Sequence, residues 1–262
     1  MTPSPETPRG EFPDGRATVI AVGEFGERVA GFMADMAASA APSQGRAEAS
    51  AAMVVRLGSA ADPGAIRNGL KAAFAGASGP VVTGLWRPWP ALCGRSDELA
   101  FEYRCPWLPI IMDHPHLRVG PLVVPGHGAC FSCFAARQAQ HDDQRTASAA
   151  VLQAYDLDGR LGPQGYLCHH ARLAAALAHV VLGRLGETSG SVAGQVVSAN
   201  VLGSGFRTHR VAARPGCSRC GRARHRGDSD VLAGLVAAIT ASRKTMTDTA
   251  GSGLQGGVSH GG

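Results

Sequence analysis

The sequence contains no apolar run of the roughly 18 residues that a membrane-spanning helix requires. Its first 16 residues are polar and rich in proline, and they lack the apolar segment of a secretion signal. We therefore expect a cytoplasmic protein without a membrane partner. Aromatic residues make up only 5% of the chain, whereas apolar residues make up 45%, which is enough for the core of a globular protein.

Acidic residues are missing between Glu187 and Asp228. Seven arginines lie in the stretch 207–226 of that interval. This distribution predicts a basic surface, which could meet nucleic acid or an acidic peptide, or could simply be solvated. We do not expect nucleic acid as the partner, but a zinc-knuckle protein that binds nucleic acid stays an alternative.

Cysteine is scarce but patterned. Seven cysteines, an odd number, fit a reducing compartment better than a disulfide framework. Four of them form two C-x-x-C pairs, and a turn that contains glycine precedes each pair. Each such pair can supply half of a tetrahedral sulfur site, whereas a redox dithiol would need only one pair. The spacing predicts a structural Zn²⁺ ion with the ligands Cys130, Cys133, Cys217 and Cys220.

The other candidate ligands and nucleophiles have weaker patterns around them. His127 precedes Cys130 by three residues and could replace one sulfur ligand. Cys93, Cys105 and Cys168 have no flanking residues that would lower the thiol pKa, so we predict small buried apolar side chains rather than nucleophiles. We assign no catalytic residue.

The first part of the chain alternates apolar runs with amphipathic stretches. Residues 17–22 are typical of a buried parallel strand, and a helix with an apolar face at Val29, Phe32, Met33 and Met36 is predicted after them. Further strands are predicted near 52–55, 81–86 and 107–112, with helices from residue 63 and over 92–103. Pro109 favours an edge strand or a strand start. This alternation predicts an α/β sheet.

The first strand and its glycine turn form half of a Rossmann unit. The G-x-G-x-x-G fingerprint is incomplete, because Ala21 takes the place of the first glycine before Gly23 and Gly26. Arg56 follows the second strand, where a nucleotide-binding fold offers an acid to the ribose. Gly23 and Gly26 therefore predict a vestigial cofactor turn, or a turn that serves close packing alone.

The second part begins with a predicted β-hairpin over 116–125 and a short helix over 131–140. A longer helix is predicted from Tyr166 to Gly186, with Leu173, Leu177, Val180 and Val181 as its core stripe. Strands over 192–201 and 206–212 and a final helix around 232–239 follow. We divide the chain into a disordered lead (1–16), a degenerate Rossmann-like portion (17–125), a zinc-knuckle and C-terminal portion (126–245) and a disordered tail (246–262).

Three segments of the sequence resemble a known family: Val119–Gly126, Cys130–Arg137 and Pro215–Gly221. They are similar to the E1/ThiF-like, cyclodehydratase-associated (leader-peptide-binding) proteins of azole-forming peptide clusters. The resemblance implies a degenerate ThiF/E1-like Rossmann sheet, with a four-cysteine zinc site that ties a C-terminal α+β portion to it. It also implies a non-catalytic scaffold that partners a YcaO-type cyclodehydratase in thiazole/oxazole peptide biosynthesis and allows a homodimer.

The chain departs from that family in two respects. The incomplete glycine loop and Arg56 argue against adenylation, so we do not expect ATP to bind. An adenylating E1-like enzyme is kept as the alternative. Only 16 residues precede the first predicted strand, which leaves no room for an N-terminal recognition element. We therefore expect the precursor peptide to be bound either directly or through a separate recognition protein.

Overall fold

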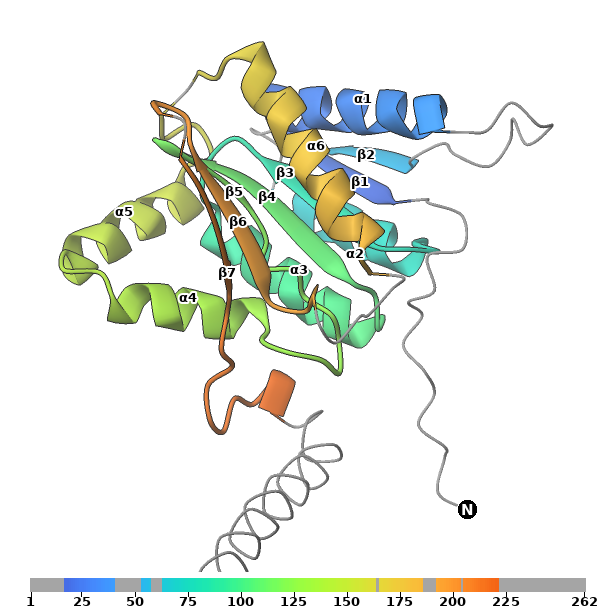
Figure 1. Cartoon of the computed structure of the whole chain (residues 1–262). Coiled ribbons are helices and arrows are strands. Elements are labelled where there is room, and N and C mark those ends of the chain that lie inside the picture. The colour runs from blue at the N-terminus through green and yellow to red at the C-terminus, as the bar shows by residue number, and fades with distance from the viewer. Residues whose placement is uncertain are drawn as a thin grey trace, which may run out of the picture. The chain divides into compact units, whose positions relative to one another are not determined.

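The computed structural model describes residues 17–40, 53–57, 63–163, 165–185, 192–203 and 205–221. All of them belong to one unit of the chain, residues 1–222. Seven strands form one sheet in the order β2-β1-β3-β4-β5-β6-β7, with helices on both faces (Figure 1). The mixed α/β class predicted from the sequence is confirmed, whereas the division of the chain at residue 125 stays a prediction.

The parallel half of the sheet contains β1 (Thr18–Val22), β2 (Met53–Leu57), β3 (Val81–Leu85) and β4 (Trp107–Asp113). They are linked through α1 (Gly23–Ala40), α2 (Pro63–Ala75) and α3 (Pro90–Glu102). Every residue of β1 and β3 is buried, as expected for parallel strands covered on both faces. Ile66, Leu70 and Phe74 form the buried face of α2, so the predicted periodicity of this helix is confirmed.

Pro109 lies in β4, which is the central strand, so the predicted edge position is wrong. The carbonyl oxygen of Pro109 accepts a hydrogen bond from the amide of Gly120, 2.8 Å away. The proline nitrogen faces the same side, between the end of the β5 ladder at Val119 and an isolated bridge from Trp107 to Val123. Because the partner chain leaves the ladder there, a central strand tolerates the missing N–H.

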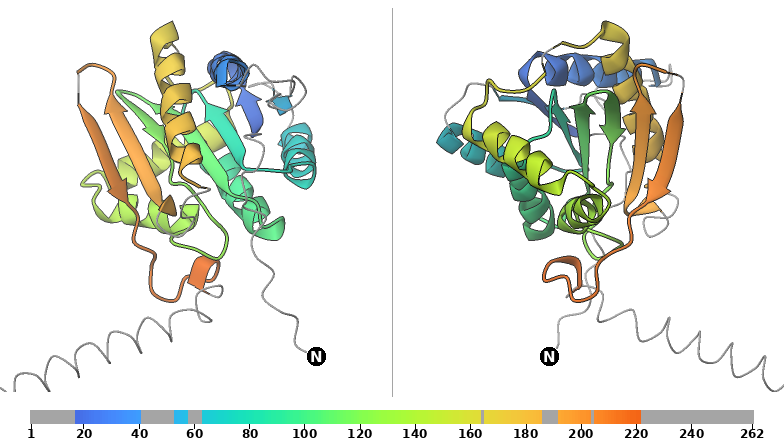
Figure 2. Two further views of the ribbon diagram at one scale, coloured as in Figure 1. Left: turned by 45° about the vertical axis from the view of Figure 1, so that its right-hand side comes forward. Right: turned by 90° about the vertical axis from the view of Figure 1, so that its left-hand side faces the viewer.

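The antiparallel half contains β5 (His116–Val119), β6 (Gln195–Asn200) and β7 (Phe206–Arg210). β4 and β5 form a hairpin, so only part of the predicted hairpin over 116–125 is a strand. α4 (Phe131–Gln140) and α5 (Arg145–Leu157) lie on one side of this half, and α6 (Cys168–Gly183) lies on the other, beside α1 (Figure 2). All five residues of β7, the edge strand, are exposed.

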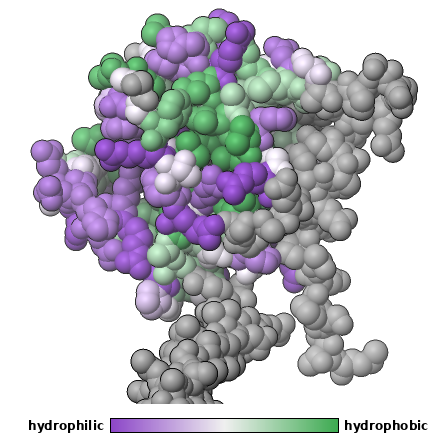
Figure 3. Space-filling model, in the orientation of Figure 1, coloured by the Kyte–Doolittle hydropathy of each residue, from purple (hydrophilic) through white to green (hydrophobic). Residues whose placement is uncertain are grey.

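α6 confirms the predicted stripe in part. Val181 is buried, and Leu173 and Leu177 are partly buried against the core, whereas Val180 is 62% exposed and the other buried residues are mostly alanines. Small side chains let α6 pack closely against α1, which decides which face turns inward. Apolar side chains over α6 and hydrophilic ones over α4 and α5 are visible in Figure 3.

α5 was not predicted from the sequence, and none of its residues is buried. Arg87, directly after β3, attaches it: the guanidinium lies 4.8 Å from the ring of Tyr155 and donates to the Tyr155 carbonyl at 2.9 Å. The final helix predicted around 232–239, the lead and the tail lie outside the described residues. Within the described part of the chain, no helix is long and apolar enough to cross a membrane.

Candidate metal centre

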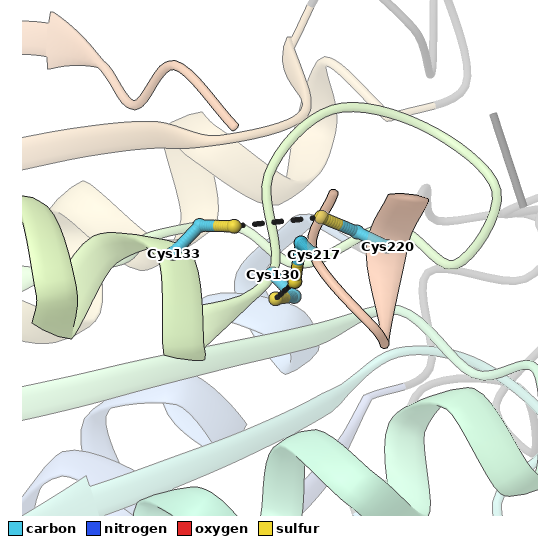
Figure 4. Close-up of side chains that lie close together, drawn as sticks. All are labelled: Cys130, Cys133, Cys217 and Cys220. Atoms are coloured by element: carbon cyan, nitrogen blue, oxygen red, sulfur yellow. Dashed lines mark hydrogen bonds between the residues drawn. The ribbon is translucent and has the colours of Figure 1, made fainter. Parts of the chain in front are cut away.

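The two predicted cysteine pairs come together in the fold. The four sulfur atoms of Cys130, Cys133, Cys217 and Cys220 lie within 4.8 Å of one another, and all four residues are buried. The Cys130 and Cys217 sulfurs are 3.7 Å apart, and those of Cys133 and Cys220 are 3.5 Å apart (Figure 4). Zn–S bonds of about 2.3 Å in a tetrahedron imply sulfur separations of roughly 3.8 Å. The spacing is too long for disulfides and fits a tetrahedral metal ion.

The first pair is positioned by the N-terminal turn of α4. Cys130 is the N-cap residue in extended conformation, and Cys133 lies one turn further on. The amides of Cys133 and Phe134 both point back to the Cys130 carbonyl, at 3.1 and 3.2 Å. Phe131, between the two cysteines, packs against Trp107 of the central strand. The sheet core thus fixes this pair directly.

The second pair follows β7 on a loop that has little core of its own. Gly216 has a positive φ of 67°, which a glycine adopts without strain, and it turns the chain into Cys217. The Gly221 amide donates to the Cys217 carbonyl at 2.9 Å. In addition, the Arg214 amide donates to the Cys133 sulfur at 3.3 Å, so the loop also supports a ligand of the first pair.

Asp97 of α3 connects both pairs, and sequence reasoning missed it. Its buried carboxylate accepts hydrogen bonds from the Phe131 amide at 3.0 Å and from the Ser132 amide at 3.4 Å, at the start of α4. It also pairs with the guanidinium of Arg219 at 2.5 Å, between the two cysteines of the second pair. Burial raises the pKa of Asp97, while the amide of Phe131 and the charge of Arg219 oppose that rise.

Arg219 also pairs with Glu98, 3.1 Å away. Its charge is therefore neutralised within the fold instead of contributing to an open basic surface. The structure describes only part of the predicted basic stretch 207–226. Within that part, Arg219 does not add an open positive charge to the surface. No local sequence pattern could have indicated this pairing, because 122 residues separate Asp97 from Arg219.

The four thiols are crowded in a way that a cation would relieve. The nearby Cys220 thiol, together with burial, raises the pKa of Cys130. Burial likewise raises the pKa of Cys133. Thiolates this close together cannot all ionise without a compensating positive charge, and a divalent ion supplies that charge while it fixes the geometry.

The turn at Gly23 and Gly26 is shaped by packing. Gly23, with φ of 65°, starts α1 directly after β1. A Cβ atom on Gly26 would lie 2.7 Å from the Gly84 carbonyl oxygen and 3.0 Å from the backbone of Ala21. Close approach of α1 to β1 and β3 therefore explains Gly26 without a bound cofactor, and a cofactor role of these two glycines stays a prediction.

The remaining candidates fall outside the cluster. Cys93 and Cys105 are buried as predicted, and burial raises the pKa of Cys93 to about 12. Cys168 is exposed at the start of α6, so its predicted burial is wrong. His127 is exposed and does not belong to the cluster, which has its four sulfurs without it.

No protein-family model matches the sequence, and no curated protein is significantly similar to it. Among solved structures, the heterocyclase TruD superposes with a TM-score of 0.52 and 16% identity, over 79% of this chain and 27% of TruD. A heterocyclase in complex with substrate and cofactor gives 0.51 and 16%, over 81% of this chain and 26% of the other. MccB of E. coli with succinimide gives 0.45 and 16%, over 66% and 46%.

The chain thus spans about a quarter of the length of each heterocyclase that it matches. At such low identity the likeness concerns the fold alone. Because the superposition on TruD covers 79% of this chain, most of the chain has the fold of one part of that heterocyclase.

Proposed function

We propose that this chain is a non-catalytic, ThiF-like zinc scaffold that partners a YcaO-type cyclodehydratase in thiazole/oxazole-modified peptide biosynthesis. The observation that carries the proposal is the superposition on the heterocyclase TruD over 79% of the chain. The chain corresponds to about a quarter of that heterocyclase, and in this proposal the YcaO-type partner carries out the cyclisation. The precursor peptide would reach that enzyme through this chain or through a further recognition protein.

The cysteine cluster would hold a structural Zn²⁺ ion in this scaffold. Protein sulfur would take all four tetrahedral positions around the ion, which would leave no open position for a substrate or an activated water. Cys130 and Cys133 are anchored in the core, whereas Cys217 and Cys220 lie on the loop after β7. The ion would therefore fasten this loop to the body of the protein.

The glycine turn supports a non-catalytic role. Ala21 and Arg56 occupy positions where a nucleotide-binding fold has glycine and an acid, and packing against Gly84 accounts for Gly26. Arg87, after β3, is buried among the rings of Trp86, Trp89 and Tyr155 near the carboxyl end of the sheet. Open α/β sheets bind nucleotides at this end.

The test combines the purified chain with a YcaO-type enzyme and an azoline precursor peptide. We expect co-elution of the two proteins in size-exclusion chromatography, and a yield of azolines, measured as loss of water by mass spectrometry, that depends on this chain. Cys217→Ser should abolish this stimulation, whereas Cys168→Ser, at the exposed cysteine outside the cluster, should preserve it. Absence of both association and stimulation would refute the partnership.

Adenylation is tested separately by nucleotide binding and ATP–pyrophosphate exchange with the same peptide. The proposal predicts that neither is detected above the background of a denatured sample. Exchange that requires this chain would favour an adenylating E1-like enzyme instead.

A further inference from the structure

A groove of about 480 Å³ lies on the antiparallel half of the sheet. One wall is the sheet face, where Arg118 of β5, Ser198 of β6 and Arg207 of β7 are consecutive cross-strand neighbours and so point to the same side. The other wall is α4, which contributes Phe134 and Arg137. The groove ends at β7, the edge strand of the sheet.

The charge in this groove is strongly unbalanced. Four arginines and three histidines line it, whereas Asp113 is the single acidic residue among its lining residues. Asp113 pairs with Arg118 at 3.0 Å and can neutralise only one of the four arginines. The lining therefore favours a ligand that carries several negative charges.

Arg118 gives the groove a built polar site. It is only 8% exposed, it stacks on Phe134 with 5.0 Å between the guanidinium carbon and the ring centre, and its buried Nε has no hydrogen-bond partner. A buried guanidinium whose hydrogen bonds are incomplete is costly unless an acceptor approaches it. Arg118 lines this groove and also a second hollow of about 720 Å³, which residues of α5 help to line. A ligand in either hollow could reach the guanidinium of Arg118.

The open edge of β7 indicates which kind of anionic ligand fits the groove. β7 pairs with β6 on one side and is the last strand of the described sheet, and all of its five residues are exposed. In an antiparallel ladder every second residue of such a strand directs its N–H and C=O groups outward. An extended peptide can use these groups, and its alternate side chains then point over the groove.

We propose that the edge of β7 and the adjoining groove bind an acidic, extended segment of another polypeptide, which adds a strand to the sheet. The carboxylates at every second position of the segment would pair with Arg207 and with the other arginines that line the groove. A second copy of this chain is a poor occupant, because pairing β7 with itself would bring Arg207 and Arg210 of both copies together. The inference does not rest on the proposed cyclodehydratase partnership and is tested without a partner enzyme.

The probe is a fluorescein-labelled synthetic peptide of alternating glutamate and valine, with an alternating glutamine and valine peptide as its uncharged counterpart. Binding to the full chain is followed by fluorescence anisotropy at physiological salt. We expect saturable binding of the glutamate peptide only. Methylation of its alternate backbone nitrogens should weaken binding about tenfold, because the ladder hydrogen bonds are lost while the charge is kept.

Arg207→Glu should weaken binding of the glutamate peptide about tenfold or more, since it reverses a charge beside the bound segment. Arg28→Glu is the matched control, because it makes the same change of net charge at an exposed position on α1. The proposal predicts less than about a twofold change there. Equal losses in both variants, no saturable binding, or preferential binding of a single-stranded oligonucleotide would overturn the proposal.

Discussion

The two halves of the sheet differ in how their outer strands are covered and attached. β1 and β3 in the parallel half are buried along their whole length, and helices cover both faces. In the antiparallel half the edge strand β7 is exposed throughout, and the chain after it is fixed by the cysteine cluster and by the ion pair of Asp97 with Arg219. Apolar residues of β5 and β6 are buried as well. The difference therefore lies in the chain after β7, which depends on a few polar cross-links.

The largest effect is expected from removing a sulfur ligand. Cys217→Ser should abolish stoichiometric zinc and lower the free energy of unfolding by at least about 3 kcal/mol, because structural zinc can contribute about 10 kcal/mol or more. Metal analysis and thermal unfolding with and without chelator measure both quantities. Cys168→Ser is the control and should keep the metal and the unfolding temperature. A Cys217→Ser protein with full zinc and unchanged stability would contradict a shared site.

Asp97→Asn should come next. It keeps the shape of the side chain but removes the charge that Arg219 faces, and breaking a buried pair of this kind costs about 3 kcal/mol or more. Glu98→Gln removes the other acidic partner of Arg219, which is 48% exposed, and should cost less than about 1 kcal/mol. Denaturant unfolding measures both changes. If the two variants lost equal stability, Asp97 would not be the link between the cysteine pairs.

Gly26→Ala tests the parallel half, where no ion is involved. The added methyl group would meet backbone atoms of Gly84 and Ala21, so we expect a loss of about 1 to 3 kcal/mol with unchanged zinc content. Gly31→Ala, in the same helix with nothing within 4 Å of the new atom, should stabilise the protein by up to about 1 kcal/mol. The comparison of the two halves fails if Gly26→Ala releases the metal.

Alkylation of the cysteines outside the cluster should have the smallest effect on stability. Iodoacetamide at pH 8 should modify exposed Cys168 and leave buried Cys93 and Cys105 intact, as read by mass spectrometry, with no change in unfolding temperature.

The pKa of Cys93 is raised from 9.0 to about 12, so the folded chain keeps a proton that the unfolded chain releases. The free energy of unfolding should therefore fall as the pH rises from 9 to about 12. Rapid labelling of Cys93 at pH 8 would contradict this burial.

Regular patterns made much of the fold predictable. The apolar run of β1 and the i, i+4, i+8 spacing of Ile66, Leu70 and Phe74 each follow from a local pattern. α5 and the buried stripe of α6 were not predictable in this way. α5 buries no residue, and the packing of alanines against α1 selects the inner face of α6.

By itself, the sequence determined the alternation of strands and helices and the two cysteine pairs, because periodicity and short-range spacing are properties of neighbouring residues. Only the tertiary structure decided that Pro109 lies in the central strand, that Asp97 joins the two cysteine pairs through Arg219, and that Arg118 and Arg207 share a groove. These contacts join residues far apart in the chain, and strand order and helix packing bring them together. No local pattern carries that information.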